Sequence, residues 1–187
     1  LSARNSPHLL FEQMGYARPM GPPNPRRAEH LLAQFRPALE ELAEAAGRPV
    51  DDWSAYGELA AARDELVIAA GTIPAGTVAG QRMVISGRSG RDEVVRFTAT
   101  WYCATHLDPQ WDLLGTGWRV RMKGDAPLDV SLEFPVALED LGAYTPAYTA
   151  NRPVNAIPHV VAAGPGILKT RDLPPLTPST LFARSST

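Results

Sequence analysis

An alternation of apolar and polar residues between positions 93 and 134 constrains the fold of this chain more than any other sequence feature. Successive side chains of a strand point to opposite faces, so one face of a strand over 93–102 would be apolar. Its apolar positions are Val95, Phe97, Ala99 and Trp101. The segments 117–123 and 128–134 alternate in the same way, and the first places basic residues where the second places acidic ones. The pattern predicts an antiparallel hairpin within a sheet that has one apolar face.

Helical signals lie on either side of this region. Ser6 and Pro7 suit the start of a short helix that ends at Gly15. A longer helix is expected from Asn24-Pro25 to about Ala46, before Gly47. Its predicted apolar stripe consists of Leu31, Phe35, Leu39, Leu42 and Ala46. A last short helix is predicted over 153–163.

Further strands are predicted over 66–70 and 77–86, whereas residues 48–62 carry mixed signals and receive no assignment. The tail from Asp172 is rich in Pro, Ser and Thr and is expected to be loose. The elements together predict an α+β fold, with an open mixed or antiparallel sheet of about four or five strands that helices cover.

Composition excludes several classes of function. A net charge of −2 and a pI near 6.1 provide no positive field for a nucleic acid. The sequence has no apolar run of the roughly 20 residues that cross a bilayer, and a cytoplasmic protein is expected. Cys103 is the only cysteine, which excludes an internal disulfide and a zinc site of several thiolates. We expect no metal.

The densest chemistry lies between Phe97 and Trp111, where large aromatics alternate with hydroxyl residues at a strand end. This composition fits a pocket lining and an aromatic core equally well. Asp108 and Asp112 are either turn residues or catalytic carboxylates, and Pro109 favours a turn. A Cys103–His106 pair is a weak candidate for nucleophilic or metal chemistry.

A basic row at Arg119, Arg121 and Lys123 is typical of the solvated face of a strand, with an anion patch as the alternative. The standard hydrolase, metalloprotease and nucleotide-binding motifs are absent from the sequence. No catalytic residue can therefore be named from the residues alone.

Several stretches, taken in order, resemble the C-terminal part of the dihydrodipicolinate reductase-like proteins, a group that includes diaminopentanoate dehydrogenases and native NAD(P)H-dependent amine dehydrogenases. They cover nearly the whole chain, to about Pro175. The stretches are Asn5 to Gly15 (NSPHLLFEQMG), Ala75 to Gly80 (AGTVAG), Trp101 to Thr105 (WYCAT), Gly117 to Arg121 (GWRVR), Gly124 to Asp129 (GDAPLD) and Tyr148 to Pro158 (YTANRPVNAIP).

The resemblance implies the substrate-binding and dimer-forming part of an oxidoreductase that uses NAD or NADP to transfer hydride to an imine or carbonyl compound. By this resemblance Asn5 and Ser6 are expected to touch the nicotinamide, whereas the pattern alone supports a helix N-cap. The small-molecule substrate would lie in a cavity whose predicted lining is Trp101, Tyr102, Thr105 and Trp111.

The resemblance also implies a division of the chain. Residues 1–24 would be the end of a Rossmann domain and a linker, 25–171 the α+β domain, and 172–187 the tail. The sequence opens at Leu1, and we expect a nucleotide-binding domain to precede it. Without that domain the chain should be inactive. The paired-His and PSGT-type motifs of true dihydrodipicolinate reductases are absent. We therefore do not expect a substrate from lysine biosynthesis. The alternative is a stand-alone α+β ligand-binding or scaffolding protein.

Overall fold

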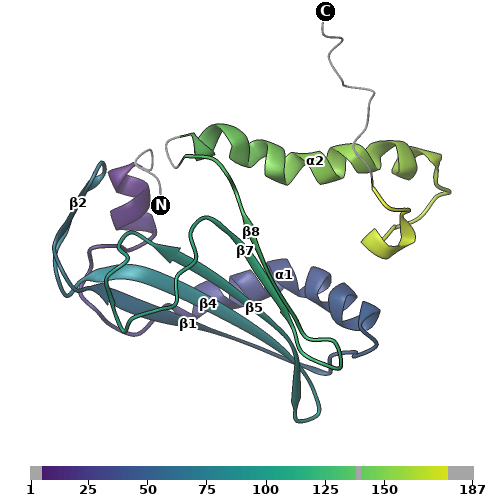
Figure 1. Ribbon diagram of the computed structural model, residues 1–187, viewed down its shortest axis with the longest axis horizontal. Helices are drawn as coiled ribbons and strands as arrows, with labels where there is room; N and C mark the ends of the chain where they lie inside the picture. The colour runs from purple at the N-terminus through teal and green to yellow at the C-terminus, as the bar shows by residue number, and fades with distance from the viewer. Residues whose placement is uncertain (1–5, 138–139, 177–187) are drawn as a thin grey trace, which may run out of the picture. The chain divides into compact units, whose positions relative to one another are not determined.

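The computed structural model describes residues 6–137 and 140–176 (Figure 1). Contacts between Cα atoms divide the chain into two compact units, Leu1–Ala137 and Leu138–Thr187, and each is described by itself. Helices and open antiparallel sheets make up the described residues, which confirms the predicted α+β class.

The first unit is built on a four-stranded sheet with the order β5-β4-β1-β6, in which every pairing is antiparallel. Its strands are β1 (Asp52–Ala62), β4 (Val78–Ser89), β5 (Asp92–Tyr102) and β6 (Leu107–Asp108). The unassigned segment 48–62 therefore contains an inner strand of the sheet. Its many Ala residues and Glu58 favour a helix locally, but pairing on both sides with β4 and β6 overrides that preference.

The main sheet has four strands, as predicted, but two hairpins whose strands were expected within it lie outside it. One consists of β2 (Leu66–Ile68) and β3 (Gly71–Ile73), the other of β7 (Gly117–Met122) and β8 (Leu128–Glu133). The second is the predicted hairpin with complementary charges. Arg119 donates two hydrogen bonds to the carboxylate of Asp129, each at 2.7 Å.

Helix α1 (Pro25–Ala45) packs on β1, β4 and β5 (Figure 1). Asn24 is its N-cap, because the side-chain oxygen accepts a hydrogen bond from the Arg26 backbone N–H at 3.1 Å. The predicted stripe is right for Leu39 and wrong for Leu42, which is 60% exposed. The fully buried positions are Ala28, Leu39 and Ala43, so the packed face is rotated away from the side that carries Leu42.

The predicted short N-terminal helix is observed as a π-helix, η1 (His8–Gln13). Leu10 of η1 is fully buried in a cluster with Tyr16 and Val78, so this single turn is held against the sheet unit by its apolar side. The Tyr16 hydroxyl is buried there and has no hydrogen-bond partner among the described residues.

In a second core cluster, Leu107 and Trp111 pack against Ala60 and Ile73. Gly80 makes this packing possible. A Cβ atom at Gly80 would lie 2.8 Å from the Trp111 ring, closer than carbon atoms can approach. The glycine therefore admits the indole to the sheet surface.

The second unit contains α2 (Leu141–Ala162) and the 3₁₀ turn η2 (Thr170–Asp172). Helix α2 begins well before the predicted 153–163, because the helix continues through Pro146 and Pro153, where the sequence predicts a stop. Hydroxyl groups of Thr145 and Thr149 donate to the carbonyls one turn earlier. No helix of the described residues is long and apolar enough to span a bilayer.

Candidate functional site

A groove of about 400 Å³ opens in the first unit where η1, α1, β4 and β5 meet. Small-molecule sites in proteins are typically clefts of about 300–1,000 Å³ with apolar walls and a few polar groups. The groove has that character. Its lining residues are Leu9, Gln13, Met14, Arg26, Arg27, His30, Leu31, Gln81, Met83 and Trp101.

Strand pairing supplies the floor of the groove. Gln81 of β4 is the cross-strand partner of Trp101 of β5, and Met83 lies two residues along β4 on the same face. Gln81 and Met83 are each 4% exposed. The floor therefore combines an indole, a thioether and one buried amide.

The buried amide belongs to a hydrogen-bonded clamp that holds η1 on the sheet. Arg27 donates to Gln81 Oε1 at 2.7 Å, to the Met14 carbonyl at 2.7 Å and to the Gln13 carbonyl. Gln81 Nε2 donates to the same Met14 carbonyl at 2.6 Å. The carbonyls at the end of η1 have no helical partner, so the guanidinium supplies the donors that the helix end lacks.

The walls come from two helical segments whose register is set by the clamp. Leu9 projects from η1, and Leu31 from the second turn of α1. Arg26 and Arg27 lie in the first turn of α1, which contains no acidic residue. Positive charge is disfavoured at a helix N-terminus, so the carbonyl oxygens around Arg27 offset an otherwise unfavourable placement.

His30 completes the rim on α1. Its Nε2 lies 3.0 Å from the side-chain nitrogen of Gln34. An amide nitrogen can only donate, so this contact links the Gln34 side chain to the His30 ring. Among the residues that the structure describes, the lining contains three basic side chains and no carboxylate.

The structure separates the residues predicted for a substrate cavity. Trp101 lines the groove, whereas Tyr102 points to the opposite face of β5 and packs on the cluster that contains Trp111. The Tyr102 hydroxyl donates to the Leu114 carbonyl at 2.7 Å. Thr105 is exposed, and its carbonyl accepts a hydrogen bond from Gln110. Only Trp101 of the four lines the groove.

The predicted nicotinamide contacts lie at the start of the chain. Asn5 is outside the described residues. Ser6 Oγ accepts a hydrogen bond from the Leu9 backbone N–H at 3.1 Å, which is the capping interaction that the pattern Ser6-Pro7 also allowed.

Trp111 makes a cation–π contact with Arg82. The Arg82 guanidinium lies over its ring, 4.3 Å from the centroid. The same guanidinium is 3.5 Å from a carboxylate oxygen of Glu58 and donates to Thr100 Oγ1 at 3.3 Å. Through these contacts Arg82 covers the second core cluster and has a structural role.

The other chemical candidates have structural partners. Burial raises the pKa of the Cys103 thiol, which favours the unreactive protonated form. His106 faces Asp64, with 3.5 Å between Nδ1 and the carboxylate, and both side chains are exposed. Among the residues that the structure describes, no group of three or more His, Cys, Asp or Glu side chains could hold a metal ion.

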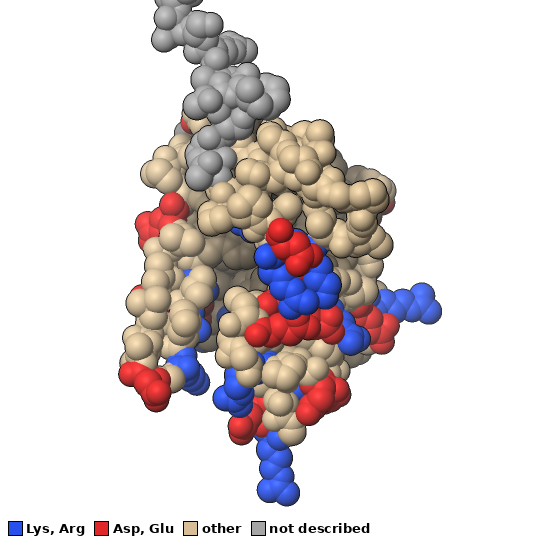
Figure 2. Space-filling view, turned by 90° about the vertical axis from the view of Figure 1, so that its right-hand side faces the viewer, with Lys and Arg blue, Asp and Glu red and all other residues tan. Residues whose placement is uncertain are grey.

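Charges outside the groove are mixed in sign. Asp112 is 3.7 Å from Arg119 and 3.9 Å from Arg121, and both guanidinium groups also reach Asp129. On the face drawn in Figure 2, basic and acidic side chains lie beside one another. Within the predicted basic row, the charges of Arg119 and Arg121 are therefore neutralised by the carboxylates of Asp112 and Asp129.

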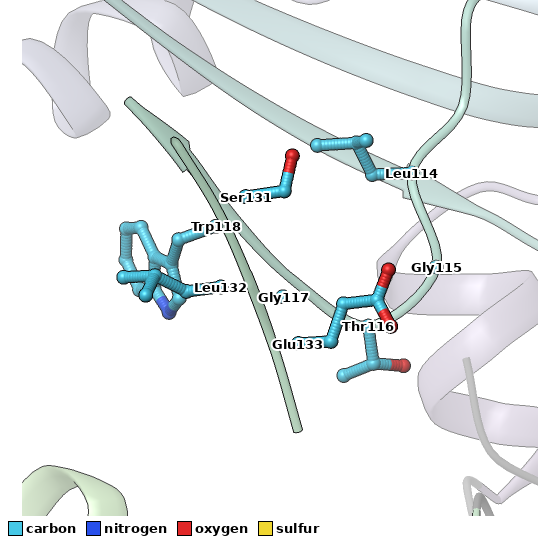
Figure 3. Close-up of a pocket in the computed structure, with 8 residues that line it drawn as sticks. All are labelled: Leu114, Gly115, Thr116, Gly117, Trp118, Ser131, Leu132 and Glu133. Atoms are coloured by element: carbon cyan, nitrogen blue, oxygen red, sulfur yellow. The ribbon is translucent and has the colours of Figure 1, made fainter. Parts of the chain in front are cut away.

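A second hollow, beside the β7–β8 hairpin, is too small for a substrate. It measures about 10 Å³, close to the volume that one water molecule needs. Figure 3 shows Trp118 and Leu132 on one side of the hairpin and Ser131 on the other. The groove of the first unit remains the candidate site.

Sequence reasoning missed most of the groove. Arg27 contacts Met14 and Gln81, which are 13 and 54 residues away in the sequence, and no local pattern reports such contacts. One signal was available. Arg27, His30 and Leu31 are spaced three and four residues apart, so they share one face of the predicted helix.

Comparison with known proteins identifies the family. No curated protein matches the chain. The family described as the 2,4-diaminopentanoate dehydrogenase C-terminal domain matches residues 33–185, which include most of α1, the whole main sheet, the hairpins and α2. The match extends over far more than half of the 187 residues, and the chain therefore belongs to the family of 2,4-diaminopentanoate dehydrogenase C-terminal domains.

Proposed function

We propose that this chain is the substrate-binding and dimer-forming part of an NAD(P)-dependent oxidoreductase that reduces an imine or carbonyl compound. The observation that carries the proposal is the groove of about 400 Å³, with Trp101 and Met83 in its floor, in a chain of this dehydrogenase family. The name of the family refers to 2,4-diaminopentanoate, an amino acid. We infer a small organic amine, imine or carbonyl compound as the substrate class here.

The nucleotide would be held by another domain. Dinucleotide-binding units have parallel strands joined by helices, whereas every strand pair among the described residues is antiparallel. The nicotinamide nucleotide, when bound, supplies the hydride. Asn5 and Ser6 are the residues proposed to approach its nicotinamide, and the Ser6 hydroxyl already orients the start of η1.

The groove residues would position the substrate and exclude water. Leu9, Leu31, Met83 and Trp101 form apolar walls, which favour a substrate with a hydrocarbon body. The clamp of Arg27 and Gln81 fixes the η1 wall, so the walls keep one spacing. Water-free walls protect a reacting imine from hydrolysis.

Assembly into a homodimer is the second part of the proposal. One face of the β7–β8 hairpin carries Trp118, Val120 and Met122 opposite Leu132, Val130 and Leu128. Trp118 is 54% exposed and Leu132 is 52% exposed. A two-stranded hairpin is marginally stable alone, so an apolar face of this kind gains from being covered.

Sedimentation of the wild type and of a Trp118→Glu/Leu132→Glu variant tests the dimer. The wild type is expected to sediment as a dimer and the variant as a folded monomer. The exposed Val67→Glu substitution on β2, where Val67 is 74% exposed, serves as the control and should leave the dimer intact. A monomeric wild type would refute dimer formation.

Enzyme assays of the complete gene product test the function. NADH and NADPH oxidation is followed with ketones and ammonium as substrates, in the wild type and in Trp101→Ala. The variant should lose at least about tenfold in kcat/KM, because it removes one aromatic wall, about 1.4 kcal/mol or more of binding. Val67→Ala should match the wild type. The 187-residue chain alone should neither bind NADH or NADPH nor catalyse the reduction of any of these substrates.

A stand-alone binding protein is the alternative. The chain alone would then bind a small ligand in the groove, and the complete gene product would show no nucleotide-dependent turnover of any carbonyl or imine compound. That pair of results would replace the oxidoreductase proposal.

A further inference from the structure

The depth of the groove depends on one unbranched side chain in its floor. We propose that Met83 is a specificity-determining residue, which limits the length of the hydrocarbon chain that the groove admits, and that Gly57, outside the lining, holds Met83 in its observed position. The inference rests on the proposed function and deepens it, because it defines the size of the compound that the same site accepts.

The strand register places Met83 between two small neighbours. Its cross-strand partner on β1 is Gly57, and its partner on β5 is Ala99. Directly opposed residues of antiparallel strands project from the same face of a sheet, with Cβ atoms about 4.5–5.5 Å apart. A glycine and an alanine leave most of the space beside Met83 unfilled, so its side chain has room to lie towards either strand.

The end of the Met83 side chain lies over Gly57. A Cβ atom added to Gly57 would be 3.2 Å from Met83 Sδ and 3.5 Å from Met83 Cε. The thioether therefore occupies the place that a side chain at position 57 would take. Met83 is only 4% exposed there, although it lines the groove. The absence of a side chain at Gly57 thus draws Met83 towards β1 and leaves the groove deeper.

The other neighbour of Gly57 is rigid. The same added Cβ atom would lie 3.1 Å from Cβ of Pro23, which belongs to a ring. A methionine side chain has three rotatable bonds and adapts to its surroundings. A methyl group at position 57 is therefore expected to displace Met83 rather than Pro23. The displaced side chain would move towards β5, where Trp101 and the groove lie.

Two substitutions should therefore change the groove in opposite directions. Gly57→Ala makes it shallower without altering any lining residue, because it moves Met83 into the groove. Met83→Ala makes it deeper, because Cγ, Sδ and Cε are removed from the floor. An apolar ligand can then extend by about two or three carbon atoms, and each buried methylene changes a dissociation constant about fourfold.

Neutral probes of increasing length test the proposal on the 187-residue chain. The straight-chain alkan-2-ones from butan-2-one to decan-2-one are titrated, and binding is followed by isothermal calorimetry and Trp fluorescence. Among the described residues, Trp101 is the only tryptophan of the lining, so Trp101→Phe identifies the fluorescence change that reports the groove. Kd should decrease about fourfold per methylene until the chain reaches Met83, and then stay constant. The longest ketone that still gains affinity defines the length limit.

The variants make the assignment to Met83 specific. Met83→Ala should raise the length limit by about two or three carbon atoms, and Gly57→Ala should lower it, so that the longest ketones bind roughly fourfold more weakly. Met83→Val should raise the limit by less than Met83→Ala, and it carries the test if the alanine variant does not fold. Ile85→Val is the matched control. Ile85 is fully buried two residues along β4 and outside the lining, so its variant should keep the wild-type limit.

Urea unfolding verifies that each variant is folded before the titrations are compared. An unchanged length limit in the folded Met83 variants, a higher limit in Gly57→Ala, or an equal shift in Ile85→Val would overturn the proposal. Absence of binding of every ketone at millimolar concentration would overturn it as well.

The complete gene product separates this inference from the proposed function. If it reduces ketones, but the dependence of kcat/KM on chain length is the same in the wild type, Met83→Ala and Gly57→Ala, the size limit is wrong while the oxidoreductase function stands. If the length limit shifts as expected in the binding experiment but no nucleotide-dependent reaction is found, Met83 remains the size determinant and the oxidoreductase function is wrong.

Discussion

Replacement of Arg27 by methionine should destabilise the first unit, whereas the same replacement at Arg26 should not. Two of the hydrogen bonds that Arg27 donates, to the Met14 carbonyl and to Gln81 Oε1, are partly buried and 2.7 Å long. A hydrogen bond from a charged donor contributes roughly 1.5–3 kcal/mol, so the loss of both costs about 3 kcal/mol at the low end. An exposed substitution such as Arg26→Met changes stability by at most about 0.5 kcal/mol.

Urea unfolding followed by Trp fluorescence measures this difference in the right part of the chain. All four tryptophans lie in the first unit, so the signal reports that unit. A loss of 3 kcal/mol corresponds to a decrease in Tm of roughly 6–12 °C for a chain of this size. A double-mutant cycle with Gln81→Met should give a coupling free energy of about 1 kcal/mol or more. If the free energies of unfolding of Arg27→Met and Arg26→Met differ by less than about 0.5 kcal/mol, the hydrogen bonds of Arg27 do not stabilise the unit and the reasoning is refuted.

Three further substitutions have expected outcomes that the same unfolding assay checks. Tyr16→Phe removes a buried hydroxyl that has no partner and should raise the free energy of unfolding by about 1 kcal/mol; a decrease would mean that the hydroxyl is bonded. Gly80→Ala forces a methyl group against the Trp111 ring and should cost about 1–3 kcal/mol, while Gly21→Ala, with open space around it, should be neutral. The Arg96 guanidinium beside Glu93 holds the pKa of that carboxyl below its ordinary value of 4.5. The contribution of Glu93 to the free energy of unfolding is therefore complete above about pH 4.5 and is lost as the pH falls through the lower folded pKa. Glu93→Gln should therefore flatten the acid side of the stability profile, and an unchanged profile would contradict this.

The parts of the fold that local chemistry determines could be predicted from the sequence. The cap at Asn24 and the alternation in β5, β7 and β8 are encoded within a few residues, and the structure contains those elements close to the expected positions. The charge complementarity of the last hairpin was also readable, because Arg119 and Asp129 occupy the polar side of each strand.

The parts that depend on distant partners could not. Strand β1 is defined by its pairing with β4 rather than by its own composition. Helix α2 continues through Pro146 and Pro153, which local rules treat as stops. The groove needs Met14, Arg27 and Gln81 to meet, and only the tertiary fold brings them together.

The aromatic segment shows the same limit at the scale of one strand. Its composition predicted either a pocket or a core, and both occur. Trp101 faces the groove, while Tyr102 faces the cluster around Trp111. Strand alternation implied this separation, but the sequence did not show which face has the groove and which has the core.

That separation leaves the two sides of β5 open to independent evolutionary change. Residues 97, 99 and 101 share the side on which Phe97 stacks against Phe35 and Trp101 meets the groove. Mutational drift at position 101 can therefore reshape ligand preference while Tyr102, one residue further on, keeps its contacts with the core. Libraries that randomise only the groove side of this strand should retain a high proportion of folded members, so directed selection for new substrates would best begin there.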